Sequence, residues 1–122
     1  MTTVGEMLRK KGSAVYSIDP DAMVYEALRM MAHHNTGALM VVHEVKVEVI
    51  LTERDIVRKV DLAGKTAKET RVSEIMTSKV ITVDCSQPLE ECVALMDEKS
   101  IRHLPVYDGR KLMGLISVRD VL

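Results

Sequence analysis

The stretch that decides the fold is LTERDIV at residues 51–57, and residues 116–122 repeat its pattern as ISVRDVL. In both copies a short apolar run precedes a hydroxyl residue, and an aspartate follows three positions later. A hydroxyl residue is a favoured helix N-cap, and a carboxylate at the third helical position serves the first turn. Each copy therefore predicts a buried strand that turns directly into a helix.

The repeat extends well beyond these seven residues. A shift of 65 residues aligns positions 15–57 with positions 80–122 without a gap. Nine aligned pairs are identical: Val15/Val80, Asp19/Asp84, Glu26/Glu91, Met31/Met96, Leu39/Leu104, Val41/Val106, Lys46/Lys111, Arg54/Arg119 and Asp55/Asp120. A solenoid needs three or more repeats. Two copies instead predict two similar halves, packed about a pseudo-twofold axis.

Apolar runs and turn residues give each half the order β-α-β-β-α, an α/β (α+β) fold. The first half is expected to contain strands at 14–18, 38–42 and 46–51 and helices at 23–34 and 53–59. The second half is expected to contain strands at 80–83, 103–107 and 112–116, a helix at 88–99 and another from 118. Asp21 and Ser86 are the expected N-caps of the two long helices, and Gly37 is expected to end the first of them.

Short helices are expected at 3–8 and 71–76. The predicted domain boundaries are therefore a first repeat with an N-terminal helix at 1–60, a linker with a short helix at 61–79, and a second repeat at 80–122. The final helix is expected to be truncated, continuing beyond Leu122 in a longer chain.

Composition excludes several classes of function. Of the 122 residues, 47% are hydrophobic, which allows a real core, and 17 Lys and Arg balance 18 Asp and Glu. Without a basic excess, and with Tyr16, Tyr25 and Tyr107 as the only aromatic residues, nucleic-acid binding is disfavoured. There is no membrane-length apolar run and no signal-peptide pattern, so a cytoplasmic protein without a membrane partner is expected.

The cysteines and histidines do not predict a metal site. Cys85 and Cys92 match no redox or zinc spacing and are expected to be reduced and partly buried. His33 and His34 close a helix, where positive charge suits the helix dipole. No metal and no required cofactor are predicted.

Several motifs together resemble a pair of CBS domains, the regulatory module named after cystathionine β-synthase. They are GALMVV at 37–42, LTERD at 51–55, EIMT at 74–77, RHLPV at 102–106 and GLIS at 114–117 with Asp120. The resemblance implies a binding module rather than an enzyme. It also implies an adenosine-containing ligand (AMP, ADP, ATP, NAD or S-adenosylmethionine) in a cleft between the repeats, and further association into a homodimer.

The same resemblance implies roles for particular residues. Asp55 and Asp120 would hold the ribose hydroxyls, with Thr52 and Ser117 near the phosphates. Arg102 and His103 would reach the phosphates from the repeat opposite Asp55. Adenine would pack on an aliphatic wall formed by Ile18, Val83, Leu104 and Pro105. The complete set of candidate ligand-binding residues is Ser17, Ile18, Thr52, Arg54, Asp55, Thr82, Val83, Arg102, His103, Pro105, Ser117, Arg119 and Asp120.

Each of the two clefts departs from the family pattern in one respect. Val49 stands where the second repeat has Gly114, a position that the family usually fills with glycine. The cleft of Asp120 keeps the glycine but faces Gly37 and Ala38 instead of basic residues. The cleft of Asp55 is ranked first, because phosphate charge needs basic partners.

Other interpretations remain open at this point. The Thr/Ser-x-x-Asp motifs are also ordinary helix caps, and Arg58 and Lys59 are expected to face solvent. A ligand-free dimerisation module with degenerate clefts is the main alternative function. A nucleic-acid-binding regulator is disfavoured by charge, and an enzyme ranks last because no activated nucleophile or catalytic carboxylate pair is apparent.

A homodimer formed through the helices of the two halves is expected on residue grounds as well. Ile56, Val57 and Val60 form an apolar stripe on the helix after Thr52. We expect this stripe to be exposed in a monomer, since so short a chain offers little to cover it.

Overall fold

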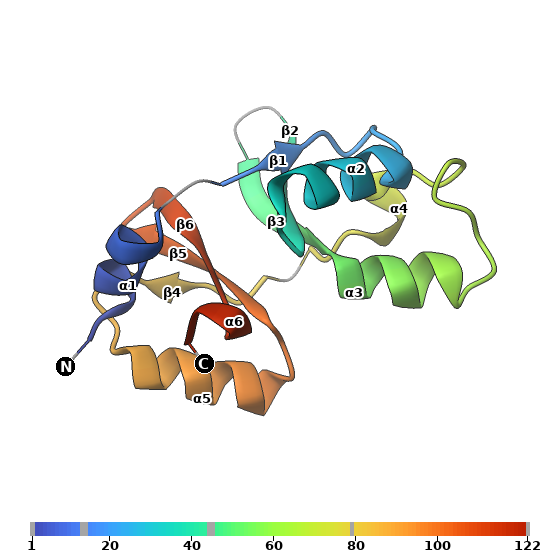
Figure 1. The fold of residues 1–122 in the computed structure, drawn as a ribbon. Coiled ribbons are helices and arrows are strands. Elements are labelled where there is room, and N and C mark those ends of the chain that lie inside the picture. The colour runs from blue at the N-terminus through green and yellow to red at the C-terminus, as the bar shows by residue number, and fades with distance from the viewer. Residues whose placement is uncertain (1, 13–14, 44–45, 79, 122) are drawn as a thin grey trace. The chain divides into compact units, whose positions relative to one another are not determined.

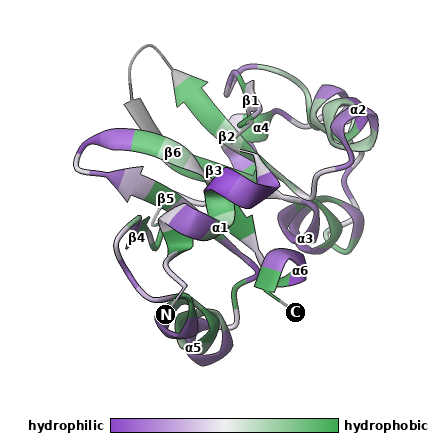
Figure 2. Ribbon diagram, turned by 60° about the vertical axis from the view of Figure 1, so that its left-hand side comes forward, coloured by the Kyte–Doolittle hydropathy of each residue, from purple (hydrophilic) through white to green (hydrophobic). Residues whose placement is uncertain are grey.

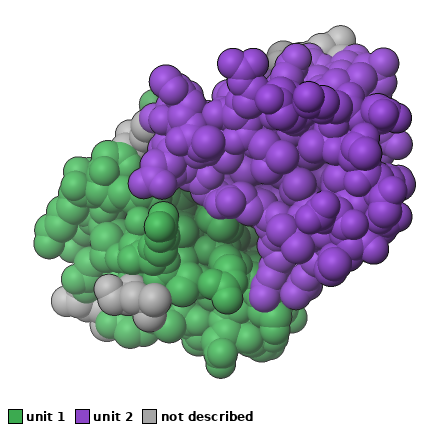
Figure 3. Space-filling view, turned by 45° about the vertical axis from the view of Figure 1, so that its right-hand side comes forward, with its two compact units in different colours: residues 1–15, 81–122 green, residues 16–80 purple. Residues whose placement is uncertain are grey.

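The structure is a computed structural model that describes residues 2–12, 15–43, 46–78 and 80–121. The chain divides into two compact units, coloured separately in Figure 3. We call Tyr16–Val80 the middle unit, and Met1–Val15 together with Ile81–Leu122 the terminal unit. Each unit contains one three-stranded sheet and several helices (Figure 1), which confirms the predicted α+β fold of two similar repeats.

The middle unit follows the predicted order of elements and adds a short helix. It contains β1 (Ser17–Ile18), α2 (Val24–His34), β2 (Ala38–His43), β3 (Lys46–Thr52), α3 (Glu53–Ile56), the π-helical turn η1 (Val57–Asp61) and α4 (Val72–Ile75). Strand β2 lies between β1, to which it is parallel, and β3, to which it is antiparallel. The strand expected at 14–18 is observed over its last two residues, and position 14 lies outside the described residues.

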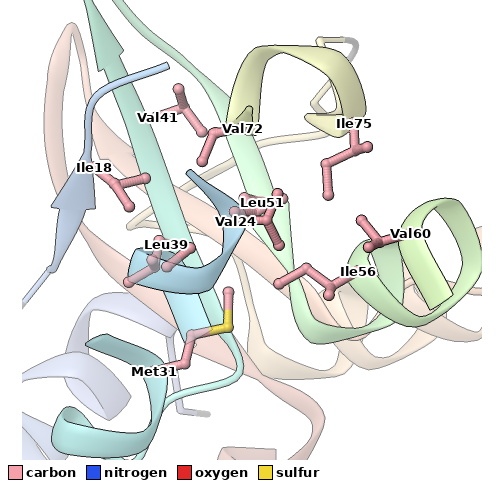
Figure 4. Close-up of a cluster of buried hydrophobic side chains, with 11 residues drawn as sticks. Ile18, Val24, Met31, Leu39, Val41, Leu51, Ile56, Val60, Val72 and Ile75 are labelled. Atoms are coloured by element: carbon pink, nitrogen blue, oxygen red, sulfur yellow. The ribbon is translucent and has the colours of Figure 1, made fainter. Parts of the chain in front are cut away.

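The core of the middle unit explains why these segments fold as they do. Helix α2 buries Val24, Ala27 and Met31, which the helical period brings to one face. Strand β2 is apolar along most of its length (Figure 2), as expected for a strand covered on both faces. The α2 side chains pack with buried side chains from β1, β2, β3, α3, η1 and α4 (Figure 4): Ile18, Leu39, Val41, Leu51, Ile56, Val60, Val72 and Ile75. Full burial of one such side chain contributes about 1.5–3 kcal/mol.

The terminal unit has the same plan. It contains α1 (Val4–Lys11), β4 (Val83–Asp84), α5 (Leu89–Lys99), β5 (His103–Asp108), β6 (Lys111–Ser117) and α6 (Val118–Val121). Strand β5 is parallel to β4 and antiparallel to β6. Gly109, with φ of 62°, supplies the left-handed residue of the tight turn between β5 and β6. A second core fills this unit: Val4, Leu8, Val83, Cys92, Met96, Leu104, Val106 and Ile116.

The two short helices do not pack with the repeats that follow them in the sequence. Helix α1 precedes the first repeat but lies in the terminal unit, where the backbone N–H groups of Val4 and Gly5 donate to Gln87 and Cys85, each over 2.9 Å. Helix α4 precedes the second repeat but lies in the middle unit. The N–H groups of Val72 and Ser73 donate there to Ala22 and Pro20, again over 2.9 Å.

The packed units therefore differ from the boundaries 1–60, 61–79 and 80–122 expected from the sequence. The reason is that each short helix pairs by backbone hydrogen bonds with the loop before a long helix. Sequence order alone does not reveal which of the two long helices that will be.

Three helix ends differ from expectation for local reasons. Helix α2 starts after Met23, which provides no side-chain cap, and Asp21 lies two residues earlier in a turn where its N–H donates to the Asp19 side chain over 2.8 Å. Likewise Ser86 bonds to Asp84 and does not cap α5. Helix α2 ends at Asn35, with φ of 51°. Asparagine tolerates this left-handed conformation, so Gly37 is not needed there.

The helix after Thr52 corrects the expectation of an exposed apolar stripe. Four α-helical residues are followed by the wider η1 turn, and both Ile56 and Val60 lie in the core of the middle unit. Only Val57 of the three is exposed, with 52% of its surface accessible. The stripe of Ile56, Val57 and Val60 therefore no longer supports the expected homodimer.

Two further observations concern the predicted class of protein. Cys92 is buried and Cys85 half-buried, and neither is in a disulfide, as expected. Among the described residues, no helix has the length and apolar character that a membrane crossing requires.

Candidate functional site

The turn at Thr52 places two site residues in reciprocal contact. The Thr52 side-chain oxygen accepts from the Asp55 N–H, and Asp55 Oδ2 accepts from the Thr52 N–H, both over 3.1 Å. This is a complete capping box, so the ordinary structural role of the motif is present in the fold.

Two further residues of the middle unit hold Asp55. The Thr77 hydroxyl lies 3.2 and 3.3 Å from its two carboxylate oxygens, and Lys59 Nζ lies 3.2 Å from Oδ1. Lys59 also donates to the Ile75 carbonyl over 3.0 Å. Lys59 faces solvent as expected, with 45% of its side-chain surface exposed, and it also makes this ion pair. The carboxylate of Asp55 thus uses both oxygens within its own unit.

The corresponding turn in the terminal unit is bonded differently. Asp120 Oδ2 accepts from the Ser117 N–H over 2.7 Å, from the Ser117 hydroxyl over 3.0 Å, and from Lys11 Nζ over 2.6 Å. Among the described contacts of this carboxylate, all fall on Oδ2. Burial raises the pKa of Asp120, but the bonds from Lys11 and Ser117 outweigh it, so the net shift is downward.

The predicted phosphate partners lie in the same unit as Asp120. His103 begins β5 and is paired in register with Ser117. Burial lowers the pKa of His103 to about 4; the positive charges of Lys11 and Arg102 add to this shift and Asp120 opposes it. His103 is therefore neutral at pH 7. The side chains that act on it identify a group of four, Lys11, Arg102, His103 and Asp120, which we call the Lys11 cluster.

The other predicted site residues divide into exposed and buried sets. Ser17, Arg54, Thr82, Arg102 and Arg119 are exposed. The expected adenine wall is packed into the cores: Ile18 is 7% exposed, Val83 3% and Leu104 0%, and Pro105 is also fully buried. Contact between these residues and a ligand stays a prediction.

Gly114 has a packing role that the sequence interpretation missed. A Cβ at this position would lie 3.0 Å from Cδ2 of Leu8 in α1. The glycine makes room for the docked N-terminal helix, and no left-handed backbone conformation is involved. Val49, its counterpart, packs against the core of the middle unit.

Sequence reasoning also missed Lys11, Lys59 and Thr77 as partners of the two aspartates. Thr77 ends the motif EIMT, which carried part of the family resemblance without a role of its own. Lys59 stands four residues after Asp55, a helical spacing at which opposite charges meet. For Lys11, 109 residues from Asp120 in the sequence, we see no local signal. In the described part of the chain, no group of three or more His, Cys, Asp or Glu side chains is placed to hold a metal ion.

Comparison with known proteins agrees with this duplicated architecture. The family model described as "CBS domain" matches residues 4–62 and again residues 72–122. The chain belongs to the CBS domain family. Its two matched regions form a CBS pair, the arrangement that the internal repeat predicted.

Relatives and solved structures place this CBS pair among regulatory modules. A mitochondrial CBS domain-containing protein of Arabidopsis thaliana, CBSX3, is 35% identical over 99% of this chain and 63% of its own length. A putative signal-transduction protein with CBS domains from Burkholderia ambifaria is 47% identical, with a TM-score of 0.93 over 98% of this chain and 90% of that one. The chain spans less than two thirds of the first curated relatives that it matches.

One solved neighbour was crystallised with ligands. The CBS domain pair of protein MJ0100, in complex with 5′-methylthioadenosine and S-adenosyl-L-methionine, is 27% identical with a TM-score of 0.83, over 99% of this chain and 93% of that one. An inosine-5′-monophosphate dehydrogenase of Thermoplasma acidophilum, 30% identical over 88% of this chain, matches over only 21% of its length. What the comparisons assign to this chain is a regulatory CBS pair and not a catalytic domain.

Proposed function

We propose that this CBS pair is a sensor module that binds an adenosine-containing ligand, namely AMP, ADP, ATP or NAD, in the cleft between its repeats. The observation that carries the proposal is the pair of half-buried aspartates, each set beside a hydroxyl residue where a strand meets a helix. An ionised carboxylate only accepts hydrogen bonds, which suits the two hydroxyl donors of a ribose. The adenosine ligands of the MJ0100 pair support the same ligand class.

Ligand binding would be an exchange of hydrogen bonds. Asp55 and Asp120 are already bonded to lysines of their own units. A ribose would replace or join these internal donors, so only the difference between the two sets contributes to affinity. A hydrogen bond to a charged group is worth about 1.5–3 kcal/mol, which makes that difference sensitive to single side chains.

A thermal-shift panel with AMP, ADP, ATP, NAD and S-adenosylmethionine tests the proposal. At a hundred times its dissociation constant, a ligand adds about 2.7 kcal/mol to the free energy of unfolding. For a chain of this size that corresponds to a rise in Tm of roughly 10 °C. Inosine monophosphate at the same concentration is a matched control for AMP, because it keeps the ribose and the phosphate and lacks the adenine amino group. No rise with any of the five compounds would refute the proposal.

A ligand-free interaction module is the second candidate. One observation favours it: both aspartates already have a lysine and a hydroxyl residue of their own unit as partners without a ligand. The same panel separates the two candidates, because only the sensor gains stability from a nucleotide. In either case we propose that the chain forms a homodimer.

A further inference from the structure

Lys11 is the last residue of helix α1 and reaches the candidate site of the terminal unit. Its Nζ lies 2.6 Å from Asp120 Oδ2 and 2.7 Å from the Leu115 carbonyl oxygen. An ammonium group has three N–H donors, so two are used here and a third remains. The Lys11 side chain is 34% exposed and that of Asp120 18%. The remaining donor therefore belongs to a partly accessible ammonium group beside Asp120.

The charges around this contact are unequal. The Lys11 cluster holds two cations, Lys11 and Arg102, against the single carboxylate of Asp120, while His103 is neutral at pH 7. The cluster therefore has a net positive charge. Arg102 is exposed, so salt screens its charge, whereas the Lys11 side chain is 34% exposed and its charge is screened less.

The aspartate in the terminal unit also has more acceptor capacity than its counterpart. The described bonds to Asp120 all fall on Oδ2, whereas those to Asp55 engage both oxygens. A ribose hydroxyl can thus bond to Oδ1 of Asp120 while Lys11 stays on Oδ2. At Asp55 it would compete with Thr77 or Lys59. This reverses the ranking from the sequence, which put Asp55 first.

We propose, building on the adenosine-binding function above, that Lys11 is the specificity-determining residue of the Asp120 site and selects phosphorylated adenosine compounds over uncharged ones. The N-terminal helix supplies the basic partner that the sequence pattern lacked near Asp120. A phosphate beside the ribose meets the third N–H of Lys11 and the charge of Arg102. Adenosine itself gains only the contacts of its ribose and base.

A purely structural role for Lys11 makes a different prediction. If the residue only ties α1 to β6 and α6, its loss weakens every ligand of the site by the same factor. If it recognises phosphate, its loss weakens AMP much more than adenosine. The ratio of the two dissociation constants therefore separates the roles, even where overall affinity falls in both.

The experiment is titration calorimetry of the full chain with AMP and adenosine. For the unaltered protein we expect AMP to bind at least tenfold tighter than adenosine. Lys11→Gln should weaken AMP about tenfold and adenosine less than threefold. Lys11→Arg, which keeps the charge, should retain most of the preference. Arg102→Gln, a second variant away from α1, should reduce the preference by a smaller factor.

Two controls decide which site is responsible. Lys10→Gln removes an exposed charge from the same helical turn and should leave both dissociation constants unchanged. Lys59→Gln alters the partner of Asp55; if this variant and not Lys11→Gln removes the preference, the inference is wrong. Equal weakening of AMP and adenosine by Lys11→Gln would also overturn it. If adenosine binds but AMP is not preferred, the inference fails alone. If neither AMP nor adenosine binds, the inference fails, and the proposed function fails with it when the thermal-shift panel is also negative.

Discussion

At the scale of single residues, the two repeats pair equivalent aspartates with lysines from different positions in the chain. Each has an aspartate in the first turn after the second strand of a hairpin, and each aspartate forms an ion pair with a lysine. In the middle unit Lys59 follows Asp55 by one helical turn. In the terminal unit Lys11 comes from the other end of the chain. The duplicated motif was readable in the sequence, and Lys59 had a local signal in its spacing from Asp55. Thr77 and Lys11 had no such signal, because their contacts depend on which segments pack together.

His103 allows a pH test at this scale. Its pKa is 6.5 in an unfolded chain and about 4 in the fold. The unfolded state therefore binds the proton more readily, so stability is present above pH 6.5 and falls as the pH is lowered toward 4. The shift corresponds to at most about 3 kcal/mol. We expect His103→Gln to remove this part of the pH dependence, measured by urea unfolding at several pH values between 7 and 4.5.

The neighbours of His103 do not obscure that window. The pKa of Asp120 is lowered from 3.8, so its contribution persists until the pH falls below that value. The control is His33→Gln, which removes an exposed histidine at the end of α2. Parallel stability curves for the unaltered protein and His103→Gln would show that burial of His103 does not matter.

At the scale of elements, the helices and hairpins follow from local patterns, while their pairing does not. The apolar run of β2 and the helical spacing of Val24, Ala27 and Met31 predicted both type and position. The same patterns misjudged Ile56 of α3 and Val60 of η1, because both side chains pack into the core of the middle unit. Whether an apolar helix face is buried depends on long-range packing, which the periodic pattern of one helix does not reveal.

The docking of α1 can be tested at Gly5. A Cβ there would lie 3.0 Å from the Cys85 carbonyl oxygen and 3.3 Å from the Cys85 Cβ. Gly5→Ala should therefore lower the free energy of unfolding by about 1–3 kcal/mol, despite the better helix propensity of alanine. Urea unfolding monitored by circular dichroism measures the loss.

The chain contains a matched control for this substitution. Ser73 makes the equivalent backbone hydrogen bond in α4, to Pro20, and its side chain is exposed. Ser73→Ala should change stability by no more than about 0.5 kcal/mol. An equally small effect of Gly5→Ala would mean that α1 shifts freely on the terminal unit.

At the scale of the whole molecule, the described surface still carries apolar side chains. Val57 is 52% exposed and Leu62 77% in the middle unit, and Val93 is 44% exposed on α5 of the terminal unit. Single exposed apolar residues are common on monomers. Val57 and Val93 lie on helical segments of the two repeats, which is consistent with the proposed homodimer.

Sedimentation at micromolar concentration tests that association. We expect a mass of about twice the 13.6 kDa of one chain. Val57→Lys, which places a charge on an exposed position, should shift the distribution toward the monomer without unfolding it. Lys10→Gln, elsewhere on the surface, should leave the mass unchanged. A monomer at all concentrations for the unaltered protein would contradict the proposal.

The exchange of short helices between the repeats also bears on how the chain matures on the ribosome. The middle unit, Tyr16–Val80, is one uninterrupted segment and can form as soon as it has emerged. The terminal unit combines Val4–Lys11, which is synthesised before the middle unit, with β4, α5, β5, β6 and α6, which are synthesised after it. Its assembly therefore waits until the middle unit has been synthesised, and closing so long a loop slows folding. Until then, the apolar face of α1 lacks its native packing partners and stays exposed to non-native contacts.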